Sequence, residues 1–118
     1  MSRVPEDHLP LTHIVYHVLL SLSGNQRHGY GIIKDVLLRT RGRLELEAGT
    51  LYAAIKRLRD DRLIEEVPAP PSADARRRYY ALTKLGQGVL RAESRRLEEL
   101  VDLAREAHVL GARPGAEA

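Results

Sequence analysis

The ten residues GTLYAAIKRL at positions 49–58 decide the fold of this 118-residue chain. Their apolar members recur at the three- and four-residue spacing of an amphipathic helix, which we expect over about residues 50–62. Leu51, Ala54, Ile55 and Leu58 form the inner face. The outer face keeps small, polar and basic side chains, namely Thr50, Tyr52, Ala53, Lys56 and Arg57.

Two further helical patterns precede this stretch. The first covers residues 11–22 and ends before Gly24, which suits a left-handed helix cap. The second covers residues 29–41 and is closed by Gly42. Its expected inward stripe consists of Ile33, Val36 and Leu37, helped by Tyr30 and Thr40.

After the third helix the pattern indicates a β-hairpin. Residues 63–67 and 78–82 are short runs rich in branched and aromatic side chains. The segment between them holds Pro68, Pro70 and Pro71, which exclude a helix. The basic cluster Arg76, Arg77 and Arg78 stands at the end of this loop.

A final long helix is expected over residues 83–110, with Thr83 as its N-cap. Gly86 and Gly88 should weaken its first turn by about 1 kcal/mol each relative to alanine. Residues 1–10 are expected to form a flexible arm and residues 111–118 a disordered tail.

Three helices, a hairpin and a long helix predict an α+β, mainly α fold. The order matches a winged helix-turn-helix domain over residues 11–82, followed by a dimerisation helix over residues 83–110. The apolar residues proposed to pair two copies are Leu90, Leu97, Leu100, Val101 and Ala104. The alternative is that this helix folds back onto its own domain.

The outer face of the third helix is the first candidate for DNA binding. A helix of this kind fits the major groove, where Lys56 and Arg57 donate to guanine or to phosphates. An ordinary solvated face is the alternative. Arg76, Arg77 and Arg78 favour DNA, because a wing along the backbone needs such charge.

The start of the second helix is another candidate. His28 or Tyr30 can contact the DNA backbone there, since helix N-termini favour phosphates. Equally, Tyr30 can pack inward while Gly29 relieves crowding. His13 and His17 lie four residues apart, but too few partners complete a metal site. We therefore expect no metal.

Composition excludes several classes of protein. The chain has no cysteine, which removes disulfides and thiolate sites, and its net charge of +3 permits a nucleic-acid partner. No catalytic triad or nucleotide-binding glycine pattern is present, so we expect neither an enzyme nor a cofactor. No segment suits a signal peptide or a membrane span, and we expect a soluble cytoplasmic protein.

Several blocks together resemble the PadR family of bacterial transcriptional regulators. They are HGYGII at residues 28–33, GTLYAAIKRL at 49–58, DRLI at 61–64 and RYYALTKLG at 78–86. The resemblance implies a winged-helix dimer that binds an operator in double-stranded DNA and usually represses genes, in some members until a small-molecule effector binds. The chain departs from the family's usual Ser-Pro with Glu47-Ala48, which could alter site choice, and its wing is rich in proline.

The leading hypothesis is a sequence-specific, dimeric DNA-binding regulator. It is supported by the outer face of the third helix together with the arginine cluster of the wing. The alternative is a winged helix that binds another protein and no DNA.

Overall fold

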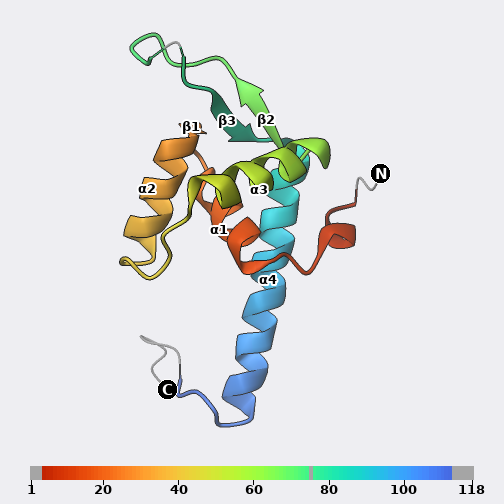
Figure 1. Cartoon of the computed structure of the whole chain (residues 1–118). Coiled ribbons are helices and arrows are strands. Elements are labelled where there is room, and N and C mark those ends of the chain that lie inside the picture. Colours follow the sequence, from red (N-terminus) through yellow and green to blue (C-terminus); the bar gives the residue numbers. More distant parts are fainter. Residues whose placement is uncertain (1–3, 75, 113–118) are drawn as a thin grey trace.

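The computed structural model describes residues 4–74 and 76–112, and it confirms the mainly helical winged helix-turn-helix fold with a long C-terminal helix. Three helices pack beneath a small sheet, and a fourth helix runs away from them (Figure 1). The elements are η1 (Pro5–His8), α1 (His13–Ser21), β1 (Arg27–His28), α2 (Gly29–Arg39), α3 (Ala48–Asp60), β2 (Ile64–Val67), β3 (Tyr79–Leu82) and α4 (Lys84–Glu106).

The sheet has three antiparallel strands in the order β1-β3-β2. The predicted hairpin is β2–β3, with Ile64 opposite Leu82, and its loop projects away from the helices (Figure 1). The sequence patterns do not predict β1. Its two residues, paired with Tyr79 and Tyr80, are too few to show an alternating pattern. This short strand ties the start of α2 to the base of the wing.

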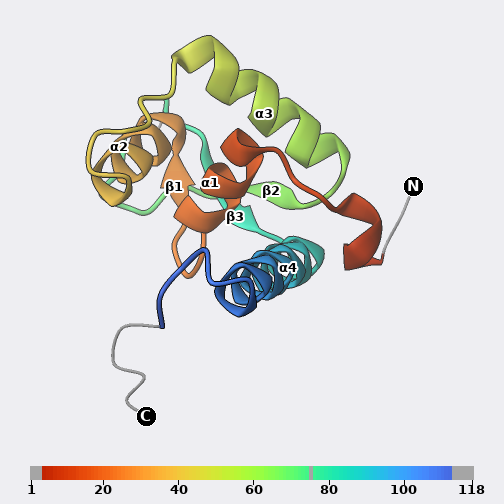
Figure 2. The ribbon, with the colours of Figure 1, turned by 90° about the horizontal axis from the view of Figure 1, so that it is seen from below.

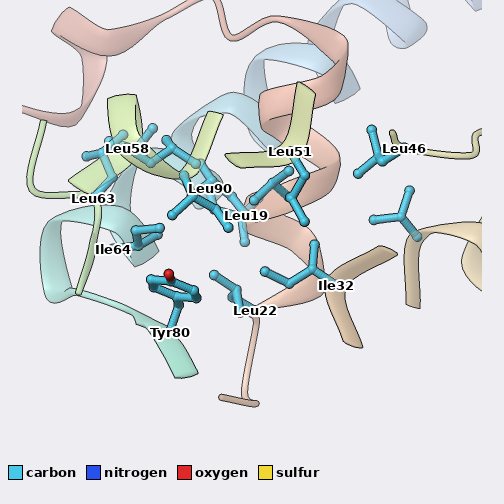
Figure 3. Packing of buried hydrophobic residues seen from close by; sticks show 14 residues of the cluster. Leu19, Leu22, Ile32, Leu46, Leu51, Leu58, Leu63, Ile64, Tyr80 and Leu90 are labelled. Atoms are coloured by element: carbon cyan, nitrogen blue, oxygen red, sulfur yellow. The ribbon is translucent and has the colours of Figure 1, made fainter. Parts of the chain in front are cut away.

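The core is an aliphatic cluster shared by all the main elements, with Tyr80 as its one aromatic member among the buried hydrophobic residues (Figure 3). Leu51, Ile55 and Leu58 are buried on α3, as predicted. On α2 the buried hydrophobic side chains are Ile32 and Val36, whereas Ile33 is only half-buried. The predicted α2 stripe was therefore one residue out of register at its start.

The N-terminal segment has more structure than the flexible arm that we expected. Pro5–His8 form a short 3-10 helix that lies against α4. The backbone N–H of Leu11 donates to the Glu93 carboxylate at 2.8 Å. Residues 1–3 lie outside the described residues, as do residues 113–118 of the expected disordered tail.

Helix α4 begins as predicted, because the Thr83 hydroxyl accepts the Gly86 N–H at 3.0 Å. It ends at Glu106, four residues before the expected end. Viewed from below, α4 lies on one side of α1 and α3 on the other (Figure 2). The lower half of α4 extends beyond the body of the domain (Figure 1).

Among the described residues, no helix has the length and apolar character that crossing a membrane requires.

Candidate nucleic-acid interface

Helix α3 presents the predicted contact residues on its outer face. All of them are exposed: Thr50, Tyr52, Ala53, Lys56 and Arg57. The Lys56 ammonium pairs with the Asp60 carboxylate one turn later at 3.0 Å. This pair balances the charge of Lys56, so the remaining positive charge of α3 comes from Arg57 and Arg59 in its last turn.

The three wing arginines, which look equivalent in sequence, have different surroundings. Arg76 pairs with Asp74 at 3.2 Å, and its hydrogen bonds lower the pKa of that carboxyl. Arg78 approaches Glu66 at 3.9 Å. Arg77 has no ion pair within 4 Å among the described residues, and its Nη1 lies 2.7 Å from the His28 ring at Nε2.

The His28 side chain caps α2, because its Nδ1 accepts the Gly31 N–H at 3.0 Å. Burial lowers the pKa of His28, and the charge of Arg77 lowers it further, which favours the neutral ring. With Nδ1 accepting, the ring proton of neutral histidine is on Nε2. Nε2 and Arg77 then direct two donors toward one another. No atom fits between nitrogens 2.7 Å apart, but an anionic oxygen lying beside both of them could accept from each.

Tyr30 lies on the surface rather than in the core, with 57% of its area exposed. The alternative that this ring packs inward is therefore wrong. The ring stacks on His28 at an interplanar angle of 4°. The Lys34 ammonium and the Arg77 guanidinium lie 5.6 and 5.9 Å from its centroid, within cation–π range.

The structure brings members of each predicted group together, but Thr50, Ala53, Lys56 and Arg57 of α3 do not line the shared pocket. One pocket is lined from three directions, by the start of α2, by α3 and by the wing. Tyr52 reaches from α3 to the first residue of α2, Gly29. The lining residues are His28, Gly29, Tyr30, Tyr52, Arg76, Arg77, Arg78 and Tyr80.

Two residues beside this surface, Glu66 and Arg59, were not predicted from the sequence. Glu66 on β2 lies 4.0 Å from Arg59 of α3 and 3.9 Å from Arg78 of the wing. No local pattern signals this contact, since it joins three elements that are separate in sequence.

The proposed dimerisation residues divide into two groups. Leu90 is 7% exposed and packs in the core of its own domain, so its assignment to a dimer interface needs correction. Beyond the body, Leu100 and Val101 are 49% and 39% exposed, and Leu97 and Ala104 are half-buried.

His13 and His17 contact each other edge to face, with ring centroids 4.6 Å apart. Burial lowers the pKa of His17, and the charges of His13 and Arg39 lower it further. Within the described part of the chain, no three potential metal ligands gather in one place.

Comparisons with known proteins agree with this geometry. The family model described as "Transcriptional regulator PadR-like family" matches residues 18–92. An uncharacterised protein of Lysinibacillus sphaericus is 30% identical over 97 residues, which cover 80% of this chain and 89% of that protein.

Solved structures give the same result. A PadR family transcription regulator from Clostridium difficile is 26% identical, with a TM-score of 0.67 over 80% of this chain and 97% of its own. A PadR-like transcription factor from Bacteroides fragilis is also 26% identical, with a TM-score of 0.67 over 80% of this chain and 88% of its own. With its winged-helix fold and a family match across most of its length, the chain belongs to the PadR-like family of transcriptional regulators.

Proposed function

We propose that the protein is a dimeric repressor that binds a specific operator in double-stranded DNA and is released by a small-molecule effector. The observation that carries the DNA-binding part is the convergence of α3, the start of α2 and the wing on one basic pocket. Repression and effector release follow from the resemblance to the family.

Each element of this surface has a distinct task in the proposal. The outer face of α3 enters the major groove, where Lys56 and Arg57 read guanine or neutralise phosphates. Thr50 donates to a phosphate, and the small side chain of Ala53 lets the helix approach closely. Arg77, His28 and Tyr30 contact the backbone, with Arg76 and Arg78 adding charge along the wing.

Arg57→Ala should weaken operator binding by about tenfold, because a good arginine contact is worth about 1–3 kcal/mol. Lys56→Ala should have a smaller effect, since Asp60 already pairs with this ammonium. Fluorescence anisotropy with a labelled operator duplex measures both affinities, and thermal unfolding checks that each variant is folded. Unchanged affinity in both folded variants would remove α3 as the contact face.

The proposed dimer uses the half of α4 that extends beyond the body. Val89 and Glu93 are buried against the chain's own domain, and the same helical face continues through Leu97, Leu100 and Ala104. No part of the described chain covers Leu100 fully. A second copy related by a two-fold axis would bury this face, and it would also present two copies of α3, the recognition helix of this fold, to two half-sites.

Leu100→Asp should convert the dimer to a monomer. Burying a leucine is worth about 1.5–3 kcal/mol, and a two-fold interface contains it twice, so dimerisation should weaken by at least about a hundredfold. Sedimentation at micromolar concentration measures the change. Leu38→Asp is the matched control, because Leu38 is 75% exposed on α2 and its replacement should leave the dimer intact. A monomeric wild type would contradict the proposal.

A further inference from the structure

Gly29, the first residue of α2, has the Tyr52 ring where a side chain would be. A Cβ atom at position 29 would lie 2.4 Å from the Tyr52 hydroxyl oxygen and 2.9 Å from Cζ. Both distances are too short for a real contact. The φ angle of Gly29 lies outside the left-handed region. Glycine is therefore needed at this position because it has no side chain, and not because of its backbone conformation.

We propose that Gly29 is a positioning residue for DNA binding, which seats Tyr52 and thereby fixes the recognition helix against α2 and the wing. The inference rests on the proposed function, because it assigns to this contact a share of DNA affinity. It also changes the role given to Tyr52. This residue lies on the exposed face of α3, and the hydroxyl end of its ring is directed at α2.

The location of the contact explains why it matters for binding. Tyr52 stands in the first half of α3, next to Ala53 and one turn before Lys56. Gly29 follows directly after His28, the residue that caps α2 and contacts Arg77. The Gly29–Tyr52 contact thus joins the surface that would face the groove to the surface that would face the backbone. A shift of the order of an ångström in such an arrangement is enough to weaken a binding site.

The contact is also one that can change without unfolding the protein. Tyr52 is 51% exposed, and the atoms nearest to Gly29 are at the far end of its side chain. An added methyl group would therefore turn the ring aside rather than disturb the core. For Gly29→Ala we expect nearly unchanged thermal stability and about tenfold weaker operator binding.

A double-mutant cycle tests this expectation. Operator affinity is measured by anisotropy for the wild type, Gly29→Ala, Tyr52→Ala and the double variant. If the added methyl acts by displacing Tyr52, Gly29→Ala should cost about tenfold in the wild type and nothing further in the Tyr52→Ala background. Equal losses in both backgrounds, or no loss with Tyr52 present, would overturn the proposal.

Gly31→Ala is the matched control. It makes the same chemical change two residues further along α2, where the nearest atom to the added Cβ is the His28 Cε1 at 3.4 Å, an ordinary van der Waals contact. Its operator affinity should stay within about twofold of the wild type. A loss as large as that of Gly29→Ala would show a general effect on α2 and would overturn the specific role of Gly29.

A second readout does not depend on DNA. In the free wild-type protein, nuclear Overhauser contacts should connect the Gly29 α protons with the Tyr52 ring, and their absence would overturn the proposal. If the contact is present but the wild type binds no DNA, the proposed function fails and the positioning role fails with it. If the wild type binds and Gly29→Ala binds equally well, only the positioning role fails.

Discussion

Gly86→Ala should lower the free energy of unfolding by about 3 kcal/mol or more, which corresponds to a fall of about 10 °C or more in the unfolding midpoint. An alanine Cβ at this position would lie 1.9 Å from the Leu63 carbonyl oxygen. That oxygen cannot move freely, because it accepts the Thr83 N–H at 3.0 Å and the Thr83 hydroxyl at 3.1 Å. The start of α4 would have to move away from Leu63, which lies in the turn between α3 and β2.

Gly49→Ala is the control for this substitution. It also places alanine in the first turn of a helix, but no atom lies within 4 Å of the added Cβ. Its unfolding midpoint should stay the same or rise, since alanine favours helices over glycine by about 1 kcal/mol. Thermal unfolding followed by circular dichroism measures both variants. An undisturbed midpoint in Gly86→Ala would contradict the close contact between α4 and Leu63.

Glu93→Ala should destabilise the fold by about 2–4 kcal/mol. Glu93 is 1% exposed, and its carboxylate accepts hydrogen bonds from the Leu11 N–H and from the Arg96 guanidinium. Truncation leaves a cavity and an unsatisfied N–H group, which together account for the loss. It should also free the N-terminal segment from α4. Chemical denaturation measures the loss, with Glu45→Ala, an exposed glutamate in the α2–α3 turn, as the control.

The contribution of Glu93 should depend on pH. Its hydrogen bonds with Arg96 and Leu11 hold the pKa of the carboxyl below the ordinary value of about 4.5, although burial opposes them. A lowered pKa in the folded state means that the stabilisation is complete above the ordinary pKa and is lost as the pH falls through the folded value. The stability difference between the wild type and Glu93→Gln should therefore be largest near neutral pH and should shrink below about pH 4. A difference that is constant over this range would contradict the charged role of Glu93.

The sequence was sufficient for the order of α1 to α4 and of the β2–β3 hairpin, because each of these elements is marked by local features. The spacing of Leu51, Ile55 and Leu58 predicts α3 and its buried face, and the prolines after Val67 mark the wing loop. Thr83 was identified as a helix cap by the same local reasoning. These features involve residues within a turn or two of one another, so no knowledge of tertiary contacts is needed.

Contacts between distant residues could not be predicted in this way. Gly86 was expected to weaken α4, whereas the structure shows that the Leu63 carbonyl requires it there. Leu90 was assigned to a dimer interface as part of the apolar stripe of the final helix, but the chain's own core covers it. A periodic pattern shows which residues share a face and does not show what covers that face.

For the candidate site, too, local features were predictable from the sequence and contacts between distant residues were not. Basic and aromatic residues marked the α3 face, the start of α2 and the wing separately. Their convergence on one pocket, the pairing of Arg76 with Asp74 and the position of Tyr52 against Gly29 depend on the packing of α2, α3 and β3. The sequence alone therefore indicates which residues belong to this surface, but not that Arg77 is the wing arginine without a carboxylate partner among the described residues.

The most direct test of the DNA-binding proposal is the affinity of the wild-type protein for an operator duplex selected from a random pool, compared with a scrambled duplex, over a series of salt concentrations. We expect at least about a hundredfold preference for the selected duplex at moderate salt. We also expect a steep fall in affinity as salt rises, because arginine and lysine contacts release counterions. Equal affinity for the two duplexes would contradict sequence-specific recognition, and no binding even at low salt would contradict a role in binding DNA.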